Sequence, residues 1–235
     1  MDRAVSRNWI RSCTLELEGA GKSLQFGDLR IRFLVRQSRV QSLNAAEFRI
    51  YNLSDSTKDQ IVSEKTEFKL ATLSAGYESN VGIIYKGNIL HTQAGRENPT
   101  DKYVDVFCRD GDRAYNWGVV KKTFAAGSKQ RDHVDEVVRV FKELGVTEGT
   151  IKGLSDQKYP RAVTLYGMAR EVMRTIAHSN NATWDIRNGK LFHTPHDDEG
   201  EGSEIRLNAN TGLIGMPVET PHGIIVTALI NPDFK

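Results

Sequence analysis

Alternation of apolar and polar residues dominates the first half of the chain. A period of two runs through "SCTLELE" (12–18), "LRIRFLVR" (29–36) and "AEFRIYNL" (46–53). It continues in three stretches bounded by Gly, Asn or Asp, namely "EFKLATLSAGY", "VGIIYKGNILHTQAG" and "DKYVDVFCRDG". Because successive side chains of a β-strand point to opposite faces, each stretch predicts a strand with one buried face. Six strands at this spacing favour an antiparallel β-barrel or β-sandwich.

Two kinds of helical signal interrupt or follow these strands. In "SDSTKDQIVSE" (54–64), Ser54 or Asp55 can cap a short helix that packs Ile61 and Val62. After residue 127 the apolar period becomes that of a helix in "RDHVDEVVRVFKELG" (131–145), with Asp132 as the expected N-cap and Gly145 as the stop. Its apolar stripe is Val134, Val137, Val138, Phe141 and Leu144.

A second helix and a hairpin are expected next. "TLYGMAREVMRTIAHSN" (164–180) carries Leu165, Met168, Val172 and Ile176 at helical spacing. "ATWDIRNGKLFHT" (182–194) then predicts a β-hairpin that turns at Asn188-Gly189. Together these elements predict a compact α+β unit.

The last part of the chain returns to strands. "PHDDEGEGSE" (195–204) reads as an exposed linker, and the stretch from Ile224 to Leu229 is apolar on both faces, so we expect it to be covered on both. The predicted division is 1–127 as an antiparallel β-barrel domain with a short helix, 128–200 as the α+β domain, and 201–235 as strands of a second, incomplete barrel.

"GAGKS" (19–23) resembles the end of a nucleotide-binding P-loop. A P-loop needs a glycine five residues before the Gly-Lys pair, and that position holds Glu16, whose carboxylate would repel phosphate. The flanking segments alternate, whereas a P-loop follows a buried strand and opens a helix. The segment Gly19–Gly27 is therefore predicted to be a hairpin connection with Lys22 exposed at its tip.

The composition argues against some classes of protein, but it indicates no particular partner. The net charge is only +2, with 26% charged residues, so nothing in the balance demands nucleic acid or an anionic membrane. Cys13 and Cys108 lie far apart and are expected to be free, buried thiols. The first residues lack the apolar region of a signal peptide, and no apolar run is long enough to span a membrane. We expect a soluble protein made in a reducing cytosol.

The most site-like cluster is "HTPHDDE". It could offer metal ligands or a hydrolase site near His193, His196 and Asp197, but a Pro-containing polar loop holds nothing rigidly, so a solvated loop is favoured. The full cluster is His193, His196, Asp197, Asp198 and Glu199. No nucleophile or metalloprotease motif appears. A third possibility, a carbohydrate- or peptide-binding β module, would require Trp9, Trp117 and Trp184 to gather on one surface.

A row of basic residues is the most informative charge pattern. Arg30, Arg32 and Arg36 share one face of a predicted strand, with Lys22 and Arg39 beyond its ends. The row would suit an acidic partner or a nucleic acid backbone. An ordinary solvated face, with Glu16 and Glu18 as cross-strand counter-charges, explains it slightly better.

Four stretches carry a resemblance to a known family. They are "AEFRIYNLSDSTKDQI", "LSAGYESNVGIIYKGNIL", "VDVFCRDGDRAYN" and "TGLIGMPVETPHGIIVTALINPDF". Their order is similar to that of the baseplate hub proteins of tailed bacteriophages, which lie between the tail tube and the central spike. The resemblance implies a β-dominated α+β fold, in which a tail-tube-like antiparallel β-barrel is followed by an inserted α+β domain and part of a second β-barrel.

The resemblance also implies a function. Three subunits would form a ring that presents six barrels, joins a sixfold tail tube to a threefold spike and leaves a channel for DNA. The expected partners are further copies in a homotrimer, the tube protein, the central spike protein, other baseplate proteins and, transiently, genomic DNA, with no membrane insertion. The location would be the virion tail baseplate, after synthesis in the host cytoplasm, and no catalysis, cofactor or metal is expected. The interface candidates are Lys22, Arg30, Arg32, Arg36, Ile224, Val226 and Leu229.

Overall fold

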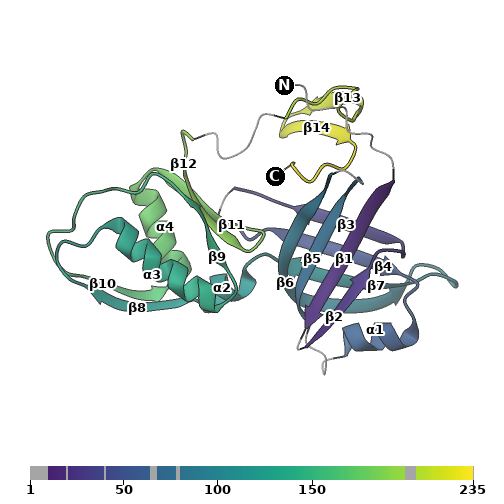
Figure 1. Ribbon diagram of the computed structural model, residues 1–235, viewed down its shortest axis with the longest axis horizontal. Coiled ribbons are helices and arrows are strands. Elements are labelled where there is room, and N and C mark those ends of the chain that lie inside the picture. The colour runs from purple at the N-terminus through teal and green to yellow at the C-terminus, as the bar shows by residue number, and fades with distance from the viewer. Residues whose placement is uncertain are drawn as a thin grey trace.

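Figure 1 shows the computed structural model, which describes residues 10–19, 21–39, 41–63, 68–77, 80–198 and 205–234. The chain forms a curved β-sheet, an α+β unit beside it and a C-terminal hairpin. The β-dominated α+β fold predicted from the sequence is confirmed.

The first sheet is antiparallel and contains seven strands in the order β2-β1-β5-β6-β7-β4-β3. The strands are β1 (Arg11–Gly19), β2 (Lys22–Phe26), β3 (Ile31–Arg36), β4 (Ala45–Tyr51), β5 (Phe68–Tyr77), β6 (Asn80–Arg96) and β7 (Lys102–Arg109). Six coincide with the predicted stretches. β2 is additional, because Leu24 and Phe26 turn inward within a segment predicted to be connection only.

The sheet curves around one core without closing. β3, β4 and β7 cross behind β1 and β2 in Figure 1, and the core takes residues from both sides, for example Leu17 of β1 and Phe48 of β4. Among the described residues, β2 and β3 remain edges that pair with one strand each. The expected antiparallel β-barrel or β-sandwich is thus observed, within the described residues, as an open, curved sheet.

The short helix α1 (Asp55–Val62) begins as predicted. The Ser54 side chain accepts a hydrogen bond from the Thr57 backbone N–H, which satisfies one of the free donors of the first turn. Ile61 is buried against the sheet, whereas Val62 is exposed, so the expectation that both residues pack is corrected. Consecutive side chains are about 100° apart around a helix, and of these two only Ile61 lies on the side of α1 that faces the sheet.

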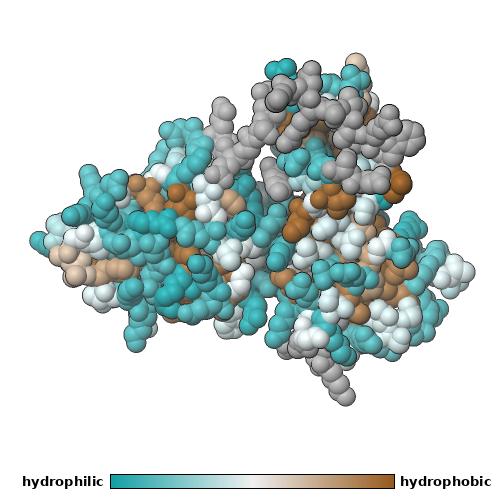
Figure 2. Space-filling model, in the orientation of Figure 1, coloured by the Kyte–Doolittle hydropathy of each residue, from teal (hydrophilic) through white to brown (hydrophobic). Residues whose placement is uncertain are grey.

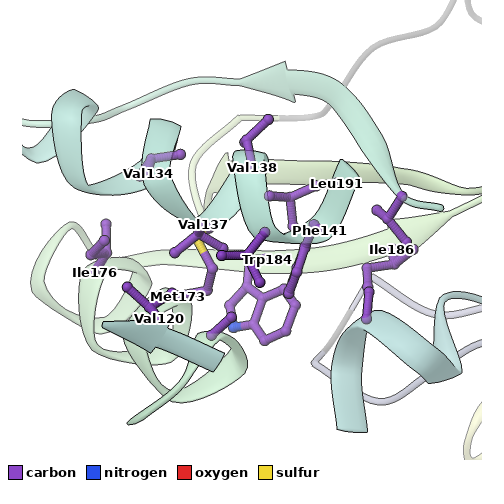
Figure 3. Packing of buried hydrophobic residues seen from close by; sticks show 14 of the residues in the cluster. Val120, Val134, Val137, Val138, Phe141, Met173, Ile176, Trp184, Ile186 and Leu191 are labelled. Carbon is purple, nitrogen blue, oxygen red and sulfur yellow. The ribbon is translucent and has the colours of Figure 1, made fainter. Parts of the chain in front are cut away.

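The α+β unit contains three helices and five strands. These are α2 (Asp112–Trp117), β8 (Val119–Phe124), α3 (Gln130–Glu143), β9 (Thr147–Ile151), β10 (Val163–Met168), α4 (Ala169–Ser179), β11 (Ala182–Arg187) and β12 (Lys190–Pro195). β8 pairs with β10, and β12 lies between β11 and β9. Figure 3 shows Trp184 among Val137, Phe141 and Met173 in the core of this unit. Ala114 already belongs to this core, so the unit begins before residue 127, because β8 pairs with β10 and not with the first sheet.

Two helix predictions need correction. Leu165 and Met168 lie in β10, and helix α4 begins only at Ala169, because pairing with β8 overrides the helical spacing. Asp132 is not the N-cap of α3. It lies at the third helical position, where its carboxylate accepts the Lys129 backbone N–H at 2.7 Å. Gly145 ends α3 as predicted, with φ of +92°.

A buried polar junction joins the α+β unit to the first sheet. The turn of the β11–β12 hairpin lies at Asn188 and Gly189, both at positive φ, as predicted. The buried Asp110 carboxylate accepts the Gly189 N–H at 3.0 Å, and the buried Asn44 amide donates to the Ile186 carbonyl at 3.0 Å. These bonds hold the turn on the sheet.

Two further features fix the position of the β11–β12 turn against the first sheet. The Asn188 side-chain oxygen accepts the backbone N–H of Lys86 in β6 at 3.1 Å. Gly111 has φ of +65°, and a Cβ there would come within 2.8 Å of Ile186 atoms. Burial raises the pKa of Asp110 to about 7, with nearby Asp185 acting in the same direction.

The chain ends in a hairpin formed by β13 (Leu213–Thr220) and β14 (Gly223–Ala228), called the C-terminal hairpin below. These strands pair only with each other among the described residues. The segment after the hairpin contacts the start of β6. The Asn80 side-chain amide donates to the Asn231 side chain at 3.2 Å, and a Cβ on Gly82 would come within 2.8 Å of the Pro232 Cβ. This contact anchors the hairpin to the first sheet.

Candidate interaction surfaces

The basic row lies on and beside the edge strand β3. Arg32 and Arg36 are exposed on the outer face, as the alternation predicts. Arg36 pairs with Glu47 of β4 at 3.3 Å, whereas Arg32 makes no ion pair with the residues that the structure describes. Arg30 precedes the strand, and its guanidinium lies 4.4 Å from the centre of the Tyr51 ring. Arg32 is therefore the cation of this row that is most available to a partner.

The expected counter-charges of the basic row are elsewhere. Four strands separate β1, which carries Glu16 and Glu18, from β3 in the order of the sheet, so these carboxylates are not cross-strand partners of the arginines. Glu16 instead accepts the Ser23 hydroxyl at 2.7 Å across the β1–β2 pair. The counter-charge actually present is Glu47, which the sequence analysis did not consider.

Lys22 stands exposed at the beginning of β2, opposite Gly19, and Gly21 at the turn has φ of +78°. Ser23 starts no helix, and both flanking strands lie in an antiparallel sheet. The prediction of a hairpin at "GAGKS" is confirmed, although the connection is shorter than Gly19–Gly27. Lys22 and β3 belong to opposite ends of the strand order.

The C-terminal hairpin exposes apolar side chains on both faces. Ile224 is 69% exposed and Met216 is 89% exposed. The other exposed apolar residues here are Ile214, Val218, Ile225, Val226 and Phe234. The expected cover on both faces is therefore absent from the described chain. Leu229 lies after β14, is half-buried and donates its backbone N–H to the Gly212 carbonyl. Figure 2 shows hydrophobic surface at the level of the hairpin and on the adjoining end of the first sheet.

A second exposed surface lies on the α+β unit. Trp117 at the end of α2 is 74% exposed, and Tyr166 of β10 is 78% exposed. Val119 is also exposed, and its register partner Met168 lies next to it on β10. We call Trp117, Val119 and Tyr166 the aromatic patch. The sequence analysis considered only Trp117 of these, and without knowing its neighbours.

The His193 cluster does not come together as a site. His193 is fully buried, its Nδ1 donates to the Lys152 carbonyl at 2.6 Å, and burial lowers its pKa. His196 and Asp197 are exposed in the turn after β12, and Asp198 pairs with Lys152 at 2.9 Å. Glu199 lies outside the described residues. This arrangement gives the hydrolase alternative no assembled catalytic group.

The tryptophans do not share a surface either. Trp184 is 1% exposed and stacks on Tyr115 at 6.0 Å, whereas Trp117 is exposed, and Trp9 lies outside the described residues. The geometry expected for a carbohydrate- or peptide-binding module is therefore not formed by Trp117 and Trp184.

The two cysteines are not joined in a disulfide. Cys13 is half-buried and Cys108 is buried, and both are free. Within the described ranges, no three His, Cys, Asp or Glu side chains gather where they could hold a metal ion. Likewise, no helix in those ranges has the length and apolar character needed to cross a membrane.

Solved structures share this fold. The 43 kDa tail protein of prophage MuSo2 from Shewanella oneidensis matches 79% of this chain and 53% of its own, with a TM-score of 0.50 and 10% identity. A tail protein from Neisseria meningitidis MC58 matches 87% of this chain and 58% of its own, with a TM-score of 0.54 and 10% identity. This chain thus covers little more than half the length of either protein. A comparison with curated proteins finds no match.

A family model provides the sequence evidence. The model described as "Baseplate hub gp41" matches residues 10–235, which include the curved sheet, the α+β unit and the C-terminal hairpin. This range also contains all four stretches on which the resemblance to hub proteins was based. The chain therefore belongs to the baseplate hub gp41 family.

Proposed function

We propose that this protein is a structural component of a phage or phage-like tail baseplate and acts by assembly, without catalysis. Membership of the hub family and the fold of phage tail proteins support this role. The observation that carries the proposal is the C-terminal hairpin. A two-stranded hairpin with apolar residues exposed on both faces is marginal by itself, and no other described strand pairs with it, so in this proposal a neighbouring subunit covers it.

In the proposed assembly, three copies form a ring between a sixfold tail tube and a threefold spike, around a channel for DNA. The three-part division is kept as part of this proposal, except that the α+β part begins at α2 and not at residue 128. The last segment, 201–235, would complete a second barrel through its partners. Ile224, Val226 and Leu229 belong to the subunit interfaces. Lys22, Arg30, Arg32 and Arg36 face neighbouring proteins or the channel, and Arg32 has no ion-pair partner of its own among the described residues.

The experiment measures the mass of the full chain by sedimentation velocity over a range of concentrations, alone and with a spike protein. We expect a trimer that dissociates in the double variant Ile224→Ser, Val226→Ser. Val62→Ser is the matched control, because Val62 is an exposed apolar residue of α1, and this variant should assemble normally. A monomer at every concentration, with no ring formed beside the spike protein, would contradict the proposal.

A further inference from the structure

The aromatic patch is a coherent surface. Trp117 ends α2, and only the extended Gly118, with φ of −68° and ψ of 117°, separates it from Val119 at the start of β8. Tyr166 is the register partner of Lys121, two residues after Val119, which places Val119, Lys121 and Tyr166 on one face of the β8–β10 pair. The opposite face carries buried Val120, which packs in the core.

The rim of the aromatic patch is positively charged. Lys121 is exposed beside Tyr166, and Arg113 lies one helical turn before Trp117 on α2. Neither cation makes an ion pair with a residue in the described part of the chain, whereas nearby Lys122 is paired with Glu136 at 2.8 Å. A partner surface that fits the aromatic patch is therefore apolar and carries a carboxylate.

The chain itself contains a surface of that kind. The C-terminal hairpin is apolar on both faces, and Glu219 of β13 is the register partner of the exposed Ile224. Glu219 makes no ion pair with any residue of the described ranges, and it is the only acidic residue within β13 and β14. The two surfaces thus complement each other in polarity and in charge.

The hairpin cannot reach the aromatic patch of its own copy. β13 and β14 lie well apart from β8 and β10 in Figure 1, and the Pro232–Gly82 contact fixes the hairpin to the first sheet. We propose that the aromatic patch binds the C-terminal hairpin of a second copy of this chain, with Lys121 and Arg113 facing Glu219. Such a contact joins different surfaces of successive copies, and it closes into a ring when the rotation between copies allows it.

The size of the patch sets the expected strength of the contact. A buried Trp or Tyr contributes about 150–250 Å² each, so the two aromatics supply roughly half of the ~800 Å² that one partner contributes to a standard interface. One such contact alone is weak, and closure of a ring adds the remaining affinity. This inference rests on the proposed self-assembly, and it specifies which surfaces meet.

The first test reverses charges in the full chain and measures association by sedimentation velocity. Lys121→Glu and Glu219→Lys should each weaken association at least tenfold, and the double variant should restore most of it. Lys142→Glu, an exposed lysine on α3, is the control and should leave association unchanged. If single reversals leave a stable oligomer intact, this inference is wrong while the proposed function stands. A chain that is monomeric in every form contradicts both.

The second test detects the contact directly. Copies carrying Lys121→Cys are mixed with copies carrying Glu219→Cys, both in a Cys13→Ser background because Cys13 is only half-buried. A short bismaleimide should then cross-link one copy to the other. Replacing the first partner by Lys142→Cys should abolish the product. An equal yield from both pairs, or no product in an oligomer, would overturn the proposed contact.

Discussion

β4 and β14 are apolar strands of similar length with opposite surroundings. In β4, Phe48 is 1% exposed and packs edge-on against Tyr85 at 5.8 Å, in a core that the chain builds by itself. In β14, Ile224 to Val226 are exposed, and β13 is the one strand of the described ranges that pairs with it. An apolar strand sequence therefore indicates that its side chains need to be buried. Only the fold shows whether residues of the same chain bury them. β4 stabilises the fold of the single chain, whereas β14 would be covered in the assembly that we propose.

The largest loss of stability is expected from a substitution in the hydrophobic core that buries β4. Phe48→Ala is expected to lower the free energy of unfolding by about 3–5 kcal/mol, because it removes a large side chain from a packed core and leaves a cavity. Urea denaturation measures the change. Leu34→Ala on the neighbouring β3 is the control, and since Leu34 is half-exposed it should cost much less. Equal losses would show that the core is not packed as described.

The next largest effect on stability is expected at Asp110, in the buried polar junction between the α+β unit and the first sheet. The pKa of Asp110 is raised from 3.8 to about 7, so its contribution to stability is complete below about pH 4 and is lost as the pH rises through about 7. A difference of about three pKa units corresponds to about 4 kcal/mol. Asp110→Asn keeps an oxygen that can accept the Gly189 N–H, and it should be more stable than the wild type at pH 8.

The measurement for Asp110 is the unfolding free energy between pH 4 and pH 8, taken as the difference between wild type and Asp110→Asn. Other groups titrate equally in both proteins, so the difference isolates Asp110. Parallel profiles would mean that Asp110 ionises in the junction without penalty. The opposite sign, with the wild type gaining stability as the pH rises, would contradict the burial of this carboxyl.

A smaller loss of stability is expected from breaking the Gly82–Pro232 contact, which anchors the C-terminal hairpin to the first sheet. Gly82→Ala should push Pro232 away from β6 and increase hydrogen exchange in residues 205–234, with about 1–2 kcal/mol lost from local stability and little change in the sheet. Pro232→Ala removes the same contact from the other side and should give the same pattern. Exchange that rises equally in β4 and β7 would show that the effect is global.

The smallest effect is expected in the hairpin itself. Ile224→Ser at concentrations where the protein is monomeric should change the free energy of unfolding by no more than about 0.5 kcal/mol, because Ile224 is largely exposed. Thermal unfolding of the dilute protein checks this. A loss comparable to that of Phe48→Ala would mean that β14 is covered within its own chain.

Local patterns predicted most of the elements. Alternation located six strands of the first sheet, the Asn188-Gly189 turn was identified by its residue types, and Ser54 marked the start of α1. Leu165 shows the limit of this approach, because its spacing suits both a helix and a strand, and pairing with β8 decides between them.

Contacts between residues far apart in the sequence could not be predicted from local patterns. Nothing in the sequence shows that β1 and β3 lie apart in the sheet, which is why Glu16 was matched with the arginines. Trp117 and Trp184 likewise look equivalent along the chain, yet one is exposed and the other is in the core. The open edges of the sheet and the polar contacts of Asp110 depend on residues distant in sequence.

Strand β6 carries both the contact with Pro232, after the C-terminal hairpin, and the contact with Asn188 of the α+β unit. Gly82 of this strand lies against Pro232, and the Lys86 backbone N–H, four residues or about 13 Å further along the strand, donates to the Asn188 side chain of the α+β unit. Over these residues β6 pairs only with β5 among the described strands, because its ladder with β7 begins at Asn88, and the β5 register shifts between Ile83 and Tyr85. A load on the hairpin would therefore reach the junction at Asn188 through backbone that the described sheet supports on one side only.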